Sequence, residues 1–211
     1  MPILMTFGDS NTHGTPPITQ RGAYERYDAA TRWPTRAATL LGPDWQLVEE
    51  GLPGRTTCFD DPMMGDHMNA VMGLRIALNS HGPLDYMTLM LGTNDVKARF
   101  GAGPESIVAG LAGLVDIALG PEMAARHPGL KLLLICPPPV QELGPLTGEF
   151  IGAAAKSKGL APALRRYCAA RSIGFLDAGT VLETSPIDGI HYAPEGHAAL
   201  SEAVATALKA L

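Results

Sequence analysis

Short apolar segments alternate with longer segments of helical pattern along the whole chain. The apolar segments show little polar alternation, which is typical of parallel strands that are covered on both faces. The segments between them have the spacing of helices that lie on a sheet. We therefore expect an α/β fold with a single three-layer α/β/α domain over residues 1–211. The expected strands are 2–7, 46–50, 85–91, 131–136 and 173–177, and the expected helices are 32–41, 68–80, 104–119, 158–171 and 194–210.

The size and charge of the chain limit the classes of protein to which it can belong. With 211 residues, of which 46% are apolar, the chain can bury a two-sided core. Its net charge of −5 is opposite to the basic surface that nucleic-acid binding requires, so we expect no nucleic-acid partner. The N-terminus has no basic region and the apolar runs are short. This pattern predicts no signal peptide, no membrane association and a cytoplasmic location.

Polar motifs follow the candidate strands at both ends of the chain. Gly8-Asp9-Ser10-Asn11 follows the first strand, Gly92-Thr93-Asn94-Asp95 follows the third, and Asp188-Gly189-Ile190-His191 lies near the C-terminus. In open α/β folds, ligand sites lie at the carboxyl ends of the strands. The three motifs together supply a hydroxyl nucleophile, an amide donor, and a histidine base with an orienting acid. That set indicates acyl transfer through a covalent intermediate.

Three long irregular segments also follow strands. They are rich in glycine, proline and polar residues, and they cover 11–31, 52–67 and 137–157. In a parallel sheet all three emerge at the edge that carries Ser10. Loops of this length in a compact domain are usually functional or disordered. We expect them to form the walls of the site or subunit contacts.

Neither the cysteines nor the polar motifs have the spacing of a metal site. The chain has an odd number of cysteines, Cys58, Cys136 and Cys168, and their spacing shows no pairing pattern. Because Cys136 follows an apolar run, we expect its thiol to be buried and inert. The metal-ligand types in the motifs are Asp9, Asn94, Asp95, Asp188 and His191. Their spacing fits no known motif, and a hydroxyl nucleophile needs no metal. We expect neither a metal nor a cofactor.

The three motifs, together with Gly54, resemble in order the four sequence blocks of the SGNH hydrolases, also called the GDSL family. Within that family the chain is most similar to the small bacterial arylesterase, acyltransferase and perhydrolase group, on the segments 49–57, 91–100 and 137–139. The resemblance spans nearly the whole chain. It implies a flavodoxin-like five-stranded parallel sheet and a homo-oligomer.

The resemblance also implies the role of each catalytic group. Ser10 is the expected nucleophile, His191 the general base, and Asp188 the acid that orients the imidazole. The expected donors to the oxyanion are the backbone N–H groups of Ser10 and Gly54 and the side-chain amide of Asn94. Gly51 is an alternative to Gly54 because the two glycines stand close together.

Four further residues are weaker candidates for substrate binding: His13, Asp9, Thr93 and Ile190. For Asp9 we favour a structural role, with hydrogen bonds to loop amides. Among the other histidines, we expect His67, His81 and His127 to be solvated and His197 to be structural. The methionines that could form a soft acyl pocket, or pack in a core or an interface, are Met63, Met64, Met68 and Met72.

The sequence therefore predicts a serine esterase for short-chain aryl or alkyl esters. An alcohol, an amine or hydrogen peroxide in place of water would give acyltransferase or perhydrolase activity. A first alternative is a carbohydrate acetylesterase with the same three catalytic groups. A second is a non-catalytic, flavodoxin-like module that binds a phosphate or a flavin. The segment 9–15 opposes this last function, because its acid would repel a phosphate.

Overall fold

A parallel sheet of five strands, in the order β2-β1-β3-β4-β5, runs through the centre of the computed structural model, which describes residues 1–211. The strands are β1 (Ile3–Gly8), β2 (Gln46–Gly51), β3 (Tyr86–Met90), β4 (Lys131–Cys136) and β5 (Gly174–Asp177). The five expected strands are confirmed. No end of a strand differs by more than one residue from its expected position. Gly8 of β1 pairs with Gly51 on one side and Met90 on the other, so these three strands end level with one another.

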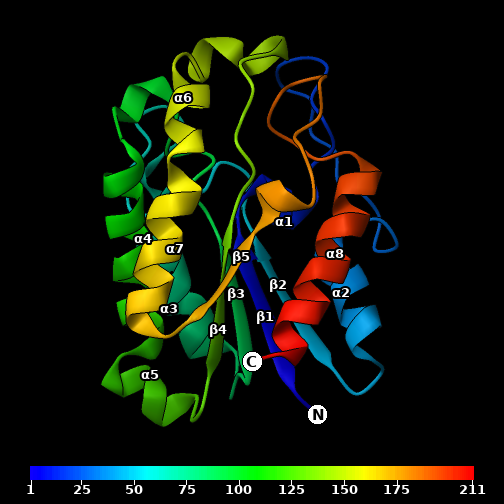
Figure 1. Ribbon diagram of the computed structural model, residues 1–211, viewed down its shortest axis with the longest axis vertical. Coiled ribbons are helices and arrows are strands. Elements are labelled where there is room, and N and C mark those ends of the chain that lie inside the picture. Colours follow the sequence, from blue (N-terminus) through cyan, green and yellow to red (C-terminus); the bar gives the residue numbers. More distant parts are fainter.

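Helices cover both faces of the sheet (Figure 1). On one face lie α2 (Trp33–Leu41) and α8 (Pro194–Lys209), and on the other lie α3 (Ala70–Ser80), α4 (Pro104–Leu119) and α7 (Leu160–Arg171). Three short helices were not expected from the sequence: α1 (Ser10–His13), α5 (Pro121–Arg126) and α6 (Ala153–Lys158). Short 3-10 helices lie at Asp66–Met68, Ala98–Phe100, Gly144–Glu149 and Ala178–Thr180. No helix is long and apolar enough to span a membrane.

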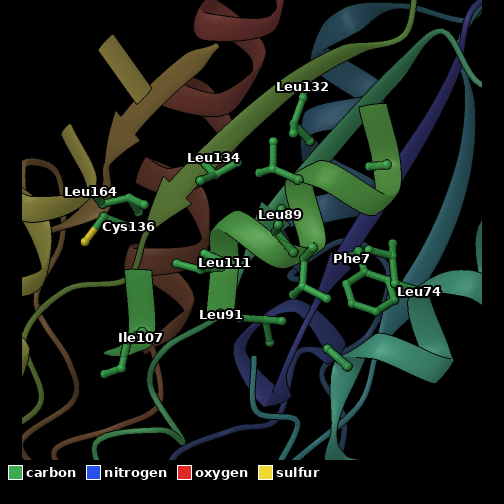
Figure 2. Packing of buried hydrophobic residues seen from close by; sticks show 14 of the residues in the cluster. Phe7, Leu74, Leu89, Leu91, Ile107, Leu111, Leu132, Leu134, Cys136 and Leu164 are labelled. Carbon is green, nitrogen blue, oxygen red and sulfur yellow. The ribbon is translucent and has the colours of Figure 1, made fainter. Parts of the chain in front are cut away.

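Alternate side chains of the central strands enter two separate apolar cores. In β4, Leu132, Leu134 and Cys136 face α4 and α7, whereas Leu133 and Ile135 face α8. Figure 2 shows the first of these cores, between the sheet and α3, α4 and α7. Both faces of the central strands β1, β3 and β4 are therefore buried, which explains why these strands are largely apolar rather than alternating, whereas the edge strands β2 and β5 are only half-buried. The thiol of Cys136 is buried as expected, and burial raises its pKa.

Two buried histidines join elements of the fold. The prediction that His127 is solvated is wrong: its Nδ1 accepts the Leu84 N–H at 3.0 Å and its Nε2 lies 2.9 Å from the Leu78 carbonyl. The polar neighbours of His127 in the sequence gave no sign of this burial. His197 is structural, as expected, because its Nδ1 accepts the Trp33 N–H at 3.3 Å and so connects α8 to α2.

Candidate active site

The nucleophile candidate lies at the junction of β1 and α1. β1 ends at Gly8, the Oδ1 atom of Asp9 accepts the Asn11 N–H at 2.9 Å, and Ser10 is then the first residue of α1. A Cβ atom at Gly8 would overlap Thr12 and the backbone carbonyl of Met90. Glycine is therefore required there, because α1 turns back tightly against the end of the sheet.

Ser10, His191 and Asp188 form a continuous chain of hydrogen bonds. The Ser10 Oγ atom lies 3.0 Å from His191 Nε2, and His191 Nδ1 lies 2.6 Å from Asp188 Oδ2. Ser10 and His191 are 4% and 3% exposed, and Asp188 is fully buried. Two groups that are 181 residues apart in the sequence thus lie within hydrogen-bond distance.

The backbone around Asp188 fixes its carboxylate. Its Oδ1 accepts the N–H groups of Ile190 and His191 at 3.0 Å each, and its Oδ2 also accepts the Ile18 N–H at 2.7 Å. Burial by itself raises the pKa of Asp188, but the hydrogen bonds from His191 and these amides outweigh it and hold the pKa below its usual value. Asp188 therefore stays ionised at neutral pH and can orient the imidazole.

Three residues that line this pocket carry N–H groups without an acceptor. The Ser10 N–H has no acceptor within α1 because it is the first residue of the helix. The Gly54 N–H has no hydrogen-bond acceptor, and its positive φ of 90° suits only glycine. Asn94 donates one N–H to the Arg55 carbonyl at 3.0 Å and keeps its second N–H free. Ser10, Gly54 and Asn94 all line the pocket, whereas Gly51 is paired in the sheet.

The pocket has a volume of about 190 Å³ and takes residues from all three long irregular segments. Its lining residues are Ser10, Thr15, Ile18, Ala23, Tyr24, Pro53, Gly54, Met64, Asn94, Lys97, Leu146, Glu149, Phe150, Ile190 and His191. The expectation that these segments form the walls of the site is therefore confirmed. No cluster of three or more histidine, cysteine or acidic side chains has the arrangement of a metal site.

Comparisons with known proteins decide the family. A sequence profile of the GDSL-like lipase/acylhydrolase family matches residues 6–199. The chain belongs to this family. Among solved structures, an aryl esterase from M. smegmatis is 33% identical with a TM-score of 0.95, and each chain is covered in full. A carbohydrate acetylesterase from Sinorhizobium meliloti is 35% identical with a TM-score of 0.95, over 100% of this chain and 99% of that chain. Among curated proteins, no sequence matches.

Membership of the GDSL family confirms the predicted fold and enzyme class. The chain is a carboxylic ester hydrolase with a single α/β domain. It carries Asn11 where the name of the family records a leucine. The Asn11 side chain donates to the Ile190 carbonyl at 3.2 Å and so ties α1 to the segment that carries His191.

Of the four weaker candidates for substrate binding in this GDSL protein, only Ile190 lines the pocket. His13 lies beside it, with its ring nitrogens 3.3 Å from Thr15 Oγ1 and 3.4 Å from the Tyr24 hydroxyl. Thr93 and Asp9 are buried outside the lining. Of the methionines, Met64 lines the pocket, Met68 is buried, and Met63 and Met72 are exposed.

Two buried carboxyl groups support the loops around the site. The Asp95 Oδ1 atom accepts the N–H and the hydroxyl of Thr57, at 2.9 and 2.5 Å, and Asp9 accepts the Asn11 N–H. Burial raises the pKa of each carboxyl group to about 6. These contacts fit the structural role that we expected for Asp9.

Arg55 is a positioning residue that the sequence did not reveal. Its Nη1 donates to the carbonyl of Gly8 at 2.9 Å and also to that of Glu50, and its guanidinium lies 4.0 Å from the centre of the Phe7 ring. Its own carbonyl accepts from Asn94. Burial lowers the pKa of Arg55 to about 10, so the side chain remains charged at neutral pH. In the sequence, an arginine after a glycine turn is typical of a surface loop.

Proposed function

We propose that this GDSL esterase cleaves esters of short acyl chains through an acyl-Ser10 intermediate. The observation that carries this proposal is the buried chain of hydrogen bonds from Ser10 through His191 to Asp188, at a pocket that also presents three N–H donors. A serine hydroxyl is a weak nucleophile, and an adjacent histidine base activates it.

In the first half of the reaction, the Ser10 Oγ atom attacks the ester carbonyl carbon while His191 Nε2 takes the hydroxyl proton. The negative charge that develops on the carbonyl oxygen is stabilised by the N–H groups of Ser10, Gly54 and Asn94. The carbon–oxygen bond to the leaving group then breaks. The alcohol or phenol leaves with the proton from His191, and the acyl group stays on Ser10.

In the second half, water attacks the acyl-Ser10 carbonyl and gives a proton to His191. The bond to Ser10 then breaks, its oxygen regains the proton, and the carboxylic acid leaves. An alcohol, an amine or hydrogen peroxide that replaced water would yield an ester, an amide or a peracid. We propose this acyl transfer as a side activity. Its support is the largely apolar lining, which includes Ile18, Leu146 and Phe150 and would favour organic acceptors over water.

The size of the pocket supports short acyl chains. A volume of about 190 Å³ is below the range of about 300–1,000 Å³ that is typical of pockets for drug-sized ligands. A long alkyl chain would therefore have to leave the pocket and lie on the surface.

A second candidate is the deacetylation of carbohydrates. Its support is Tyr24, which lines the pocket and is 74% exposed, so that its ring is free to stack on a sugar at the mouth. The carbohydrate acetylesterase of Sinorhizobium meliloti, at 35% identity, is consistent with this candidate. A panel of aryl acetates and acetylated sugars, compared by kcat/KM, separates the two. A homo-oligomer and a cytoplasmic location also remain predictions.

The direct test is the hydrolysis of p-nitrophenyl acetate by Ser10→Ala and His191→Ala. We expect each variant to lose about 10³-fold or more in kcat, because nucleophile and base act as one unit. The exposed Ser106 supplies the control Ser106→Ala, which we expect to keep full activity. Full activity in either of the first two variants would exclude the mechanism.

A further inference from the structure

Lys97 places an ammonium group without a hydrogen bond in the wall of the active-site pocket. It follows the turn that carries Asn94, lines the same pocket as Ser10 and His191, and is 5% exposed. Its Nζ atom lies 5.6 Å from the centre of the Phe150 ring. The closest carboxylate oxygen is 3.7 Å away, which is beyond hydrogen-bond distance. The Nζ atom has three donors and no hydrogen-bond acceptor in the protein, and it is not among the fully buried polar atoms, so a ligand in the pocket can reach it and supply an acceptor.

The carboxylate nearest to Lys97, that of Glu149, already pairs with two arginines. Glu149 accepts a hydrogen bond from Arg99 Nη1 at 2.8 Å, and its other oxygen lies 3.2 Å from Arg21 Nη2. Arg99 also donates to Asp61, through Nη2 at 2.6 Å and Nε at 3.2 Å. Three cations therefore share two carboxylates in this network, and the charge of the buried Asp9 also acts on Lys97.

The two carboxylates of this network are ionised. Burial by itself raises the pKa values of Glu149 and Asp61, but their hydrogen bonds from Arg99 and the nearby cations outweigh it and hold both values low. Both carboxylates thus stay ionised at neutral pH. Burial lowers the pKa of Lys97, which indicates that its protonated form lacks full compensation in the protein alone.

We propose that Lys97 is a specificity-determining residue that binds a carboxylate at the far end of the substrate's acyl group. The substrate class is then the hemiesters of short dicarboxylic acids. This inference rests on the proposed function, because it assigns an end of the pocket to the acyl group that Ser10 retains. Lys97 lines the pocket of Ser10, and after the alcohol has left, the acyl group stays on Ser10 in that pocket, where Lys97 can hold it.

The bond between Lys97 and such a substrate is charge-assisted. A carboxylate would accept one or two hydrogen bonds from Nζ, which has no acceptor in the protein. The pocket volume of about 190 Å³ admits a dicarboxylic acid of only a few carbons. A methyl group at the same position would leave the ammonium without an acceptor.

The test compares monoethyl succinate with ethyl butyrate, since the first carries a carboxylate where the second carries its terminal methyl group. The variants are Lys97→Met, which removes the charge at similar length, and Lys97→Arg, which keeps it. The control is Lys158→Met at an exposed lysine outside this pocket. We expect wild type to prefer monoethyl succinate at least about tenfold in kcat/KM. Lys97→Met should lose that preference, Lys97→Arg should keep part of it, and Lys158→Met should keep it in full.

Two results would overturn the inference. One is a wild-type enzyme that does not prefer monoethyl succinate over ethyl butyrate. This result can be observed without any variant. The other is an equal loss on both esters in Lys97→Met, which would show that Lys97 only supports the fold. The proposed function is tested apart from this, because p-nitrophenyl acetate requires Ser10 but offers Lys97 no carboxylate. An inactive wild type on that ester would contradict the esterase mechanism itself.

Discussion

At the residue scale, the two N–H donors of the Asn94 side chain have different roles: one supports the fold and the other can bind the substrate oxygen. One is held by the Arg55 carbonyl at 3.0 Å, which fixes the amide plane, and the other is free in the pocket. An amide held in this way needs little rearrangement when negative charge develops on the substrate oxygen. Its contribution should therefore appear in the transition state rather than in substrate binding.

We expect Asn94→Ala to lower kcat by about 10²- to 10³-fold with little change in KM, as for the loss of one oxyanion donor. Steady-state kinetics on p-nitrophenyl acetate provide the measurement. The exposed Asn79, changed to alanine, is the matched control. A variant in which KM rises while kcat stays constant would show that Asn94 binds substrate rather than the oxyanion.

His197 makes the fold sensitive to acid. Burial, together with the nearby His191, Arg32 and Arg36, lowers its pKa from 6.5 to about 4. Because the unfolded chain takes up this proton first, the stability that neutral His197 contributes is present above pH 6.5 and is lost as the pH falls toward 4. We expect the stability difference between wild type and His197→Asn to shrink by about 2 kcal/mol from pH 7 to pH 5. Urea denaturation at both values measures it, and an unchanged difference would refute it.

The sequence identified the residues whose chemistry is recognisable in a motif. Ser10 stands in a block that follows the first strand, and Asp188 and His191 stand in a block before the last helix, so the resemblance to the family could predict that they meet. Arg55 and Lys97 gave no such signal, because a cation in a loop is usually solvated. Their burial depends on contacts with Phe7 and with Glu149 that only the folded chain brings about.

At the element scale, a glycine turn connects the last catalytic segment to the loop after β4. Gly189 has φ 72°, its N–H donates to the Ser185 carbonyl at 2.7 Å, and its carbonyl accepts the Gln141 N–H at 2.7 Å. A Cβ atom there would overlap the Gln141 carbonyl. The hydrogen bond between Asp188 and His191 spans this turn. Its geometry therefore depends on the close contact between the backbones of Gly189 and Gln141.

Gly189→Ala should destabilise the protein by more than about 1 kcal/mol, from the positive φ alone, and should also lower kcat by displacing His191. The control is Gly113→Ala in α4, where no heavy atom lies within 4 Å of an added Cβ, and where alanine favours the helix. Thermal unfolding and kinetics on both variants provide the measurement. Equal stability and activity in the two variants would show that the turn tolerates a side chain.

The long elements could be predicted because burial sets their pattern, and the short ones could not. All five strands and the five long helices follow from apolar runs and helical spacing. Helices α1, α5 and α6 have four to six residues, which is too few for a periodic signal. Their positions are set by packing against the sheet edge and neighbouring helices rather than by their own sequence.

At the scale of the whole molecule, the fold joins the two ends of the chain into one site. β1 lies beside β3 in the interior of the sheet and delivers Ser10, while the segment before α8 delivers His191 over the same edge (Figure 1). The three loops then enclose a small pocket around both. The central claim is that Ser10 and His191 act as one unit in forming a covalent intermediate.

Labelling with a serine-directed organophosphate, followed by intact-mass and peptide mass spectrometry, tests this claim most directly. We predict one label per chain, located on Ser10, with a rate that falls at least about 10³-fold in His191→Ala. In His67→Ala, at an exposed histidine, the rate should equal that of wild type. A label on another residue, or labelling of His191→Ala at the wild-type rate, would contradict the account.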